Sequence, residues 1–175
     1  MSLIGSFPSI IGPGDPVASG PVMADFNFIA SSINAGSMVS ALKTSGVQTF
    51  TSTPSKVAFN TVAGDLKSEY DNTLYRFTAQ STGWWLVSVE MIVVIAAPFS
   101  SFEANLFLYL NGVAPTAADL FSVTPLIATT KTSITMSGLV PLSVTNYLEV
   151  FCSCNAGNIT TDAVGGNRFN IIQLR

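Results

Sequence analysis

The sequence predicts an all-β protein, a jelly-roll β-sandwich preceded by an extended arm and one short helix. Three observations support this. Short runs rich in Val, Ile, Thr, Phe and Tyr, separated by turn residues, fill almost everything after residue 49. No helical period occurs there, which favours a sandwich or jelly roll. Before it, residues 19–34 show one amphipathic helical period, and residues 1–18 are broken by Gly and Pro.

The first element, residues 1–18, is predicted to be an extended arm, because three prolines and three glycines interrupt any helix or ladder. The arm is nevertheless too apolar for a freely solvated linker. It can fold back on its own domain, or it can dock into a partner. We favour docking, through four apolar side chains: Ile4, Phe7, Ile10 and Ile11.

The second element, residues 19–36, is predicted to be a helix. Ser19 can cap its start, Pro21 falls in the first turn, and Gly36 offers a stop. Its apolar residues are spaced four, three and four apart, as in a two-heptad seam. A helix this short is marginal alone, so the seam must pack on its own domain or on its copies. The narrow seam and its small, uncharged flanks favour self-association through Val22, Phe26, Ile29 and Ile33.

Residues 37–46, which follow Gly36 and end at Gly46, are expected to be a connector, and residues 47–175 the β domain. Adjacent strand residues face opposite ways, so one member of the pair Trp84 and Trp85 should fill the core and the other a subunit contact. Both are therefore candidate trimer-interface residues. Glu90 would share a face with Trp84, and in a contact it would need a partner, for which Arg76 is the candidate. The expected strands are Val47–Ser52, Lys56–Thr61, Thr73–Gln80, Trp84–Ala96, Glu103–Leu110, Leu126–Lys131, Ser133–Ser137, Tyr147–Cys154 and Phe169–Leu174.

The composition argues against catalysis and against nucleic-acid binding. Only 10% of the residues are charged, the net charge is −3, and the seven Lys and Arg form no stripe. The absence of histidine removes the commonest general base and the usual zinc ligand. The one acidic cluster, Asp65, Glu69 and Asp71, lacks the spacing of a calcium loop and is expected to be solvated. We therefore expect no catalytic residue, no metal site and no cofactor.

The cysteines, the N-terminus and the longest apolar stretch give three further expectations. Cys152 and Cys154 are expected to stay reduced, because their spacing in a strand suits neither a bridge nor a metal site. The N-terminus lacks the pattern of a secretory signal. The longest apolar stretch, Trp84 to Pro98, is too short to span a bilayer as a helix, so no membrane insertion is expected.

The segment GDPVASGPVMADFNFIASSINAG resembles one found near the N-termini of bacteriophage fibre and other virion proteins. It departs from their pattern at Asp25, where Asn is usual. The resemblance implies attachment of the N-terminal part to phage capsid or tail proteins. It is carried by Gly14, Pro16, Val22, Met23, Asp25, Phe26, Asn27, Ile29, Ile33 and Asn34.

The β part resembles the globular heads of the complement-type and tumour-necrosis-factor-like superfamily, which are trimeric ten-strand jelly rolls. It departs from them at Thr145-Asn146, where the family has Gly-Asp, and at Trp84-Trp85, in the place of the first core aromatic. The resemblance implies a homotrimeric jelly roll and says little about a ligand. It is carried by residues 70–72, 75–79, 83–88, 108–112, 139–142, 147–150 and 167–174.

Together the two resemblances imply a bacteriophage structural protein with no enzymatic activity, assembled in the host cytoplasm and located in the virion. A homotrimeric head fibre or capsid decoration protein fits the short chain, which has no shaft repeats. The alternative is a receptor-binding tail fibre or tail-tip module whose outer loops grip a host glycan or surface protein. An enzyme such as a depolymerase would need clustered carboxylates in a groove, which the sequence does not show.

Overall fold

The computed structural model describes residues 36–95, 102–116, 121–126, 131–155, 157–162 and 166–174. The chain divides into two units, residues 1–36 and Ser37–Arg175. The predicted arm and helix belong to the first unit and lie outside the described residues, as do their candidate docking and seam residues. The regular elements of the described part are β1 Met38–Lys43, β2 Thr49–Phe50, β3 Ser55–Lys56, β4 Thr61–Asp65, β5 Tyr70–Asp71, β6 Arg76–Thr78, β7 Gly83–Ile95, β8 Phe102–Leu110, β9 Phe121–Leu126, β10 Lys131–Leu142, β11 Tyr147–Cys154, β12 Ile159–Thr161 and β13 Asn167–Leu174.

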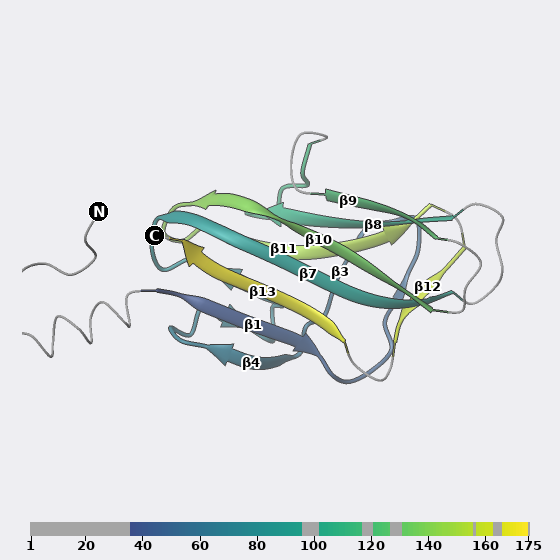
Figure 1. Ribbon diagram of the computed structural model, residues 1–175, viewed down its shortest axis with the longest axis horizontal. Coiled ribbons are helices and arrows are strands. Elements are labelled where there is room, and N and C mark those ends of the chain that lie inside the picture. The colour runs from purple at the N-terminus through teal and green to yellow at the C-terminus, as the bar shows by residue number, and fades with distance from the viewer. Residues whose placement is uncertain are drawn as a thin grey trace, which may run out of the picture. The chain divides into compact units, whose positions relative to one another are not determined.

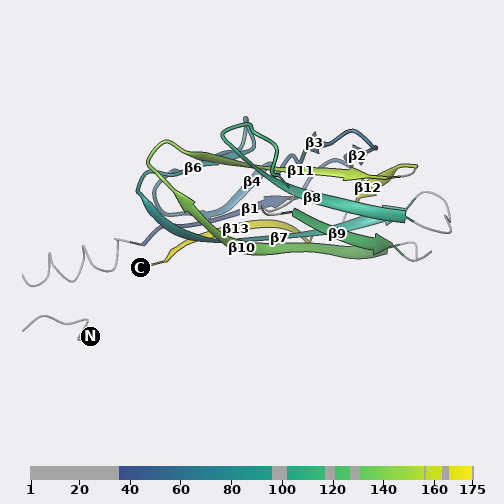
Figure 2. The same ribbon diagram turned by 90° about the horizontal axis from the view of Figure 1, so that it is seen from above.

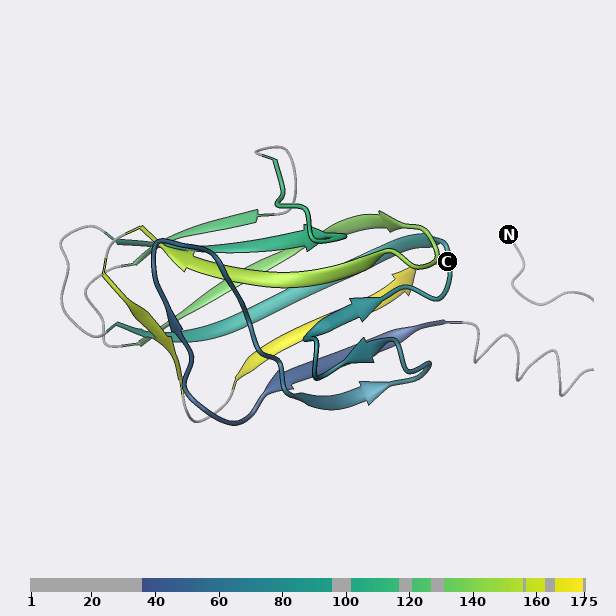
Figure 3. The ribbon, with the colours of Figure 1, turned by 180° about the vertical axis from the view of Figure 1, so that it is seen from behind.

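The strands form two antiparallel sheets that face each other as a sandwich (Figures 1 and 2). In sheet A, β4, β1, β13, β7 and β10 lie side by side, and β12 and β2 extend the far end of β7. Sheet B has the order β5-β6-β11-β8-β9, with β3 also paired to β11, and is nearest the viewer in Figure 3. Most neighbours are distant in sequence, as in a jelly roll. The predicted all-β jelly-roll sandwich is confirmed.

The core lies between the sheets, and in the long strands β7 and β10 it follows from alternation of buried and outward side chains. In β7 every second side chain, from Trp85 to Val93, is buried, while the side chains between them face outward. Trp85 packs edge-on against Phe77 of sheet B, with ring centroids 5.0 Å apart. Each large apolar side chain buried in this way contributes about 1.5–3 kcal/mol. The alternation therefore fixes which side chains of sheet A reach the surface.

The expected connector, residues 37–46, contains strand β1. This strand lies between β13 and β4, and its Val39 and Ala41 are fully buried. The segment MVSALK alternates, but it is six residues long and its ladder partner β13 is about 130 residues away, so the sequence gives little sign of it. The compact β unit begins at Ser37 and not at Val47.

Cys152 and Cys154 are free and fully buried in β11. Burial raises the pKa of both thiols, which keeps them protonated at neutral pH. Within the described ranges, no helix is long and apolar enough to cross a membrane.

Candidate functional site

The candidate site is the outward face of sheet A, where the strand register aligns apolar side chains across neighbouring strands. The first row crosses four strands and the second crosses three, and we call them together the apolar rows. They consist of Met38, Ile172, Leu86 and Leu139 in the first row, and Leu174, Trp84 and Pro141 in the second. Cross-strand neighbours of this kind lie within contact distance of each other. The rows therefore form one continuous apolar surface.

The apolar rows are unusually exposed for side chains of this type. Trp84 is 56% exposed and Leu139 is 53% exposed. Four further large side chains of the rows are 38–43% exposed: Met38, Leu86, Ile172 and Leu174. Contiguous exposed apolar surface on a folded protein marks an interaction site. Tryptophan is among the residues most enriched at the energetic centre of protein interfaces. This face is suited to bind another protein surface.

The structure separates the two predicted tryptophans. Trp84 lies on the outward face, as a contact residue must, while Trp85 is fully buried between the sheets. Trp85 is therefore a core residue and does not reach the surface of sheet A. The physical reason is the alternation of a regular strand, which sends neighbouring side chains to opposite faces.

Away from the apolar rows, the same face becomes polar. The next row is Ser40, Asn170, Ser88 and Ser137, with a hydrogen bond of 2.7 Å from Ser40 Oγ to Asn170 Oδ1. The row after it carries both charges of this region, Arg168 directly across from Glu90, with Leu42 and Thr135 at its ends. The face thus changes from apolar to small and polar, and then to charged.

The expected partner of Glu90, Arg76, lies elsewhere. Arg76 belongs to β6 in sheet B, and its guanidinium stacks over the ring of Tyr147 at 4.9 Å. The prediction of a Glu90–Arg76 pair is wrong, because the sheet neighbours of β7 at this height are β13 and β10.

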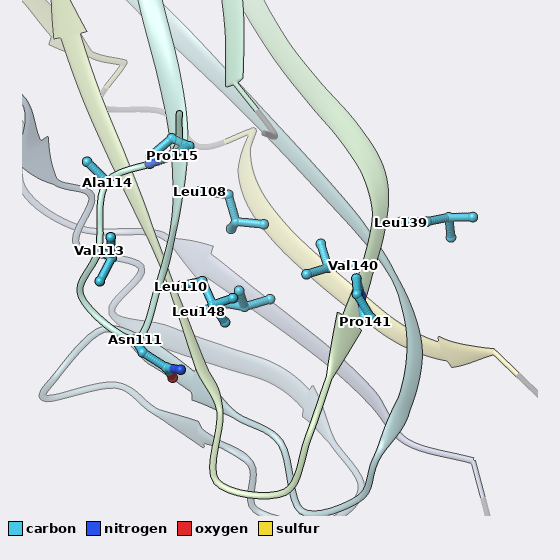
Figure 4. Close-up of a pocket in the computed structure, with 10 residues that line it drawn as sticks. All are labelled: Leu108, Leu110, Asn111, Val113, Ala114, Pro115, Leu139, Val140, Pro141 and Leu148. Atoms are coloured by element: carbon cyan, nitrogen blue, oxygen red, sulfur yellow. The ribbon is translucent and has the colours of Figure 1, made fainter. Parts of the chain in front are cut away.

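An open cleft of about 650 Å³ adjoins the apolar rows (Figure 4). It lies between the segment that ends β8 and strand β10, and it shares Leu139 and Pro141 with the rows. A tight turn shapes one wall, with positive φ at Asn111 and Gly112. The side chain of Asn111 accepts a hydrogen bond from Tyr147 N at 2.9 Å. The lining is Leu108, Leu110, Asn111, Val113, Ala114, Pro115, Leu139, Val140, Pro141 and Leu148. It suits apolar side chains better than a sugar.

The acidic cluster holds loops together. Asp65 accepts hydrogen bonds from three backbone N–H groups between residues 67 and 70. Asp71 accepts from Thr73 Oγ1, Thr73 N and Leu74 N, and these bonds lower the pKa of its carboxyl. Within the described residues, no group of three or more His, Cys, Asp or Glu side chains could hold a metal ion. The arrangement of these two carboxylates is that of turn caps.

Glu69 departs from the expected solvated loop, because it is only 3% exposed. Its carboxylate accepts hydrogen bonds from Ser37 Oγ and from Gln80 N, the latter at 3.0 Å. Burial is the main cause that raises the pKa of this carboxyl. Glu69 thereby connects the start of β1 to the segment after β6.

We expect Glu69→Gln to flatten the pH dependence of stability. A raised native pKa means that the contribution of Glu69 is fully present below its unfolded pKa, about 4.3, and is lost as pH rises through the native pKa. Glutamine does not ionise, so the variant should gain stability relative to the parent between pH 4 and pH 7.5. Thermal unfolding at several pH values measures this. The control is Glu103→Gln, at an exposed carboxylate, and an equal slope change in both variants would contradict the assignment.

Sequence reasoning missed most of the apolar rows: Met38, Leu86, Leu139, Pro141, Ile172 and Leu174. One signal was present in the sequence. The four consecutive residues Trp84 to Val87 are all apolar, so both faces of the strand are apolar there, which indicates burial on both faces. The alignment of these residues into rows depends on the pairing of four strands that are distant in the chain.

Comparison with known proteins gives the fold. No family model matches the chain, and neither does any curated protein. Among solved structures, Eiger TNF from S. frugiperda is 14% identical with a TM-score of 0.55, covering 80% of this chain and 92% of that one. Murine APRIL at pH 5.0 is 11% identical with a TM-score of 0.57, covering 79% and 99%. The globular domain of zebrafish complement 1qA protein is 14% identical with a TM-score of 0.47, covering 80% and 96%. At such identities, the first two show that the β unit has the jelly-roll fold of TNF-like domains.

Proposed function

We propose that this protein is a non-enzymatic structural protein of a bacteriophage particle, a homotrimer whose jelly-roll head is held to the virion by its N-terminal part. The observation that carries the self-association is the pair of apolar rows on sheet A. Left exposed, they would keep Trp84 and five other large apolar side chains in water. Packing against copies of the same chain removes that surface from solvent.

Several features support three copies and the absence of catalysis. The sequence resemblance of residues 47–175 is to heads that form trimers, and cyclic symmetry is the common way to close such an assembly. In the acidic cluster, Asp65 and Asp71 cap turns, Glu69 accepts hydrogen bonds from distant segments, and the chain has no histidine. An adjoining cleft that is apolar, with one amide, does not favour a glycan receptor.

The attachment to a particle rests on the N-terminal sequence. Residues 14–34 resemble the entry segment of phage virion proteins, and the arm before them offers Ile4, Phe7, Ile10 and Ile11 for docking. Within this class, a head fibre or capsid decoration protein is favoured over a receptor-binding tail fibre, because the cleft beside the apolar rows is apolar and does not favour a glycan.

Complementation of virions tests this function. Particles produced without the gene would be incubated with the full chain or with a chain that begins at Ser37, and then repurified. We expect the full chain to sediment with the particles and the shortened chain to stay free although it is folded. If the full chain does not bind, or if both bind equally, the proposed attachment is contradicted.

A further inference from the structure

We infer that Arg168 of one copy pairs with Glu90 of the next copy, so that the assembly closes around alternating charges. This inference rests on the proposed homotrimer and deepens it. Its starting point is the charged row on the outward face of sheet A. Arg168 on β13 and Glu90 on β7 are directly across from each other, and both are exposed.

The charged row lies close enough to the apolar rows to be covered by the same partner. Arg168 and Ile172 are four residues apart on one strand, as are Glu90 and Leu86 on the next. Four residues of a strand span about 14 Å. A standard interface buries about 800 Å² on each partner, which corresponds to a patch roughly 30 Å across. An interface of this width centred on the first apolar row has a radius of about 15 Å and therefore reaches Arg168 and Glu90.

Arg168 and Glu90 are cross-strand neighbours, but no ion pair joins them to each other or to another described residue of the same chain. The ion pairs Lys56–Glu149, at 2.5 Å, and Lys131–Asp162, at 2.6 Å, involve neither of the two residues. Glu90 accepts a long hydrogen bond of 3.4 Å from Ser133 Oγ, and Arg168 has no hydrogen bond or ion pair within the described part of the chain. In a single copy, water solvates both groups. An interface that removes this water must supply a counter-charge, because burying an unpaired charge is costly.

Rotational symmetry makes the neighbouring copy the source of that counter-charge. Symmetry places the same residue of every copy at the same distance from the axis. If only arginines faced one another around the axis, their positive charges would repel. Because each copy carries Glu90 beside Arg168, positive and negative charges can alternate around the axis and cancel. Guanidinium and carboxylate also pair in a defined geometry, through two parallel hydrogen bonds. The pair would thus fix the orientation of one copy relative to the next when their apolar rows are in contact.

The test uses the full chain and measures mass by sedimentation equilibrium at micromolar concentration. We expect Arg168→Glu and Glu90→Arg each to weaken association at least tenfold, and the doubly exchanged chain to recover most of it. Mixing the two single variants should also restore part of the assembly, because the carboxylate introduced in one variant can then meet the guanidinium introduced in the other. A contact confined to one chain cannot produce that result. The control is Glu103→Arg, on β8 of sheet B, which should assemble normally.

The outcomes separate this inference from the proposal beneath it. If the unaltered chain is a monomer, both are overturned. If it is a trimer and the single variants remain trimers, or if neither the double exchange nor the mixture recovers assembly, the charge pairing alone is overturned. Circular dichroism of each variant establishes that lost assembly does not reflect lost folding.

Discussion

Replacing Leu86 with aspartate is expected to convert the assembled protein into folded monomers. Leu86 lies inside the first apolar row, between Ile172 on β13 and Leu139 on β10, and it is 38% exposed in the single chain. Burying the exposed 38% of this side chain contributes about 0.6–1 kcal/mol in each copy. The aspartate loses that contribution and adds an unpaired carboxylate to an apolar contact, which is costlier still. Because the side chain points away from the core, the fold itself should survive.

A matched variant distinguishes this effect from a general loss of solubility or stability. Leu74 is 46% exposed in the turn before β6 of sheet B, far from the apolar rows in the topology. Leu74→Asp should therefore leave the mass unchanged, while Leu86→Asp reduces it to that of one chain in mass photometry. If both variants assemble alike, the apolar rows are not the contact surface. If Leu86→Asp unfolds, the expectation that this side chain is dispensable for the fold is wrong.

A chain that begins at Val47 is expected not to fold, whereas one that begins at Ser37 is expected to fold. The shorter chain lacks β1, whose backbone joins β13 to β4 and whose Val39 and Ala41 are part of the core. It also lacks Ser37, which donates to the buried Glu69. Deleting β1 removes two ladders of hydrogen bonds and two buried core side chains, which is a large loss against the free energy of unfolding of a typical domain, about 5–15 kcal/mol.

Thermal unfolding followed by circular dichroism measures the difference between the two chains. The Ser37 chain should show one cooperative transition and the Val47 chain none. A cooperative transition in the Val47 chain, at a temperature close to that of the longer one, would mean that β1 is dispensable and that the sequence-based boundary at residue 47 describes the domain better.

The fold class could be predicted because it depends on local signals. Runs of β-branched and aromatic residues, separated by turns such as Asn111-Gly112, identify strands without knowledge of their neighbours. Strand β1 could not be recognised in the same way. It is short, it is bounded by glycines, and its buried character comes from pairing with β13 at the other end of the chain.

Only those features of the candidate site that depend on the geometry of a single strand could be predicted from the sequence. Alternation was enough to place Trp84 and Trp85 on opposite faces, although not to say which faced outward. The rows that join Trp84 to Leu174 and Pro141 require the order and register of three strands. The wrong partner for Glu90 has the same cause, since the sequence suggests β6 as a neighbour and the sheet supplies β13.

The mass of the purified full chain in solution tests the central claim most directly. Sedimentation equilibrium at micromolar concentration should give a single species of three times the chain mass of 18.4 kDa. Association through the outward face of sheet A and the predicted helix seam both require this result. A stable species of 18.4 kDa over the same concentration range would contradict the account, because the apolar rows would then remain exposed in the functional protein.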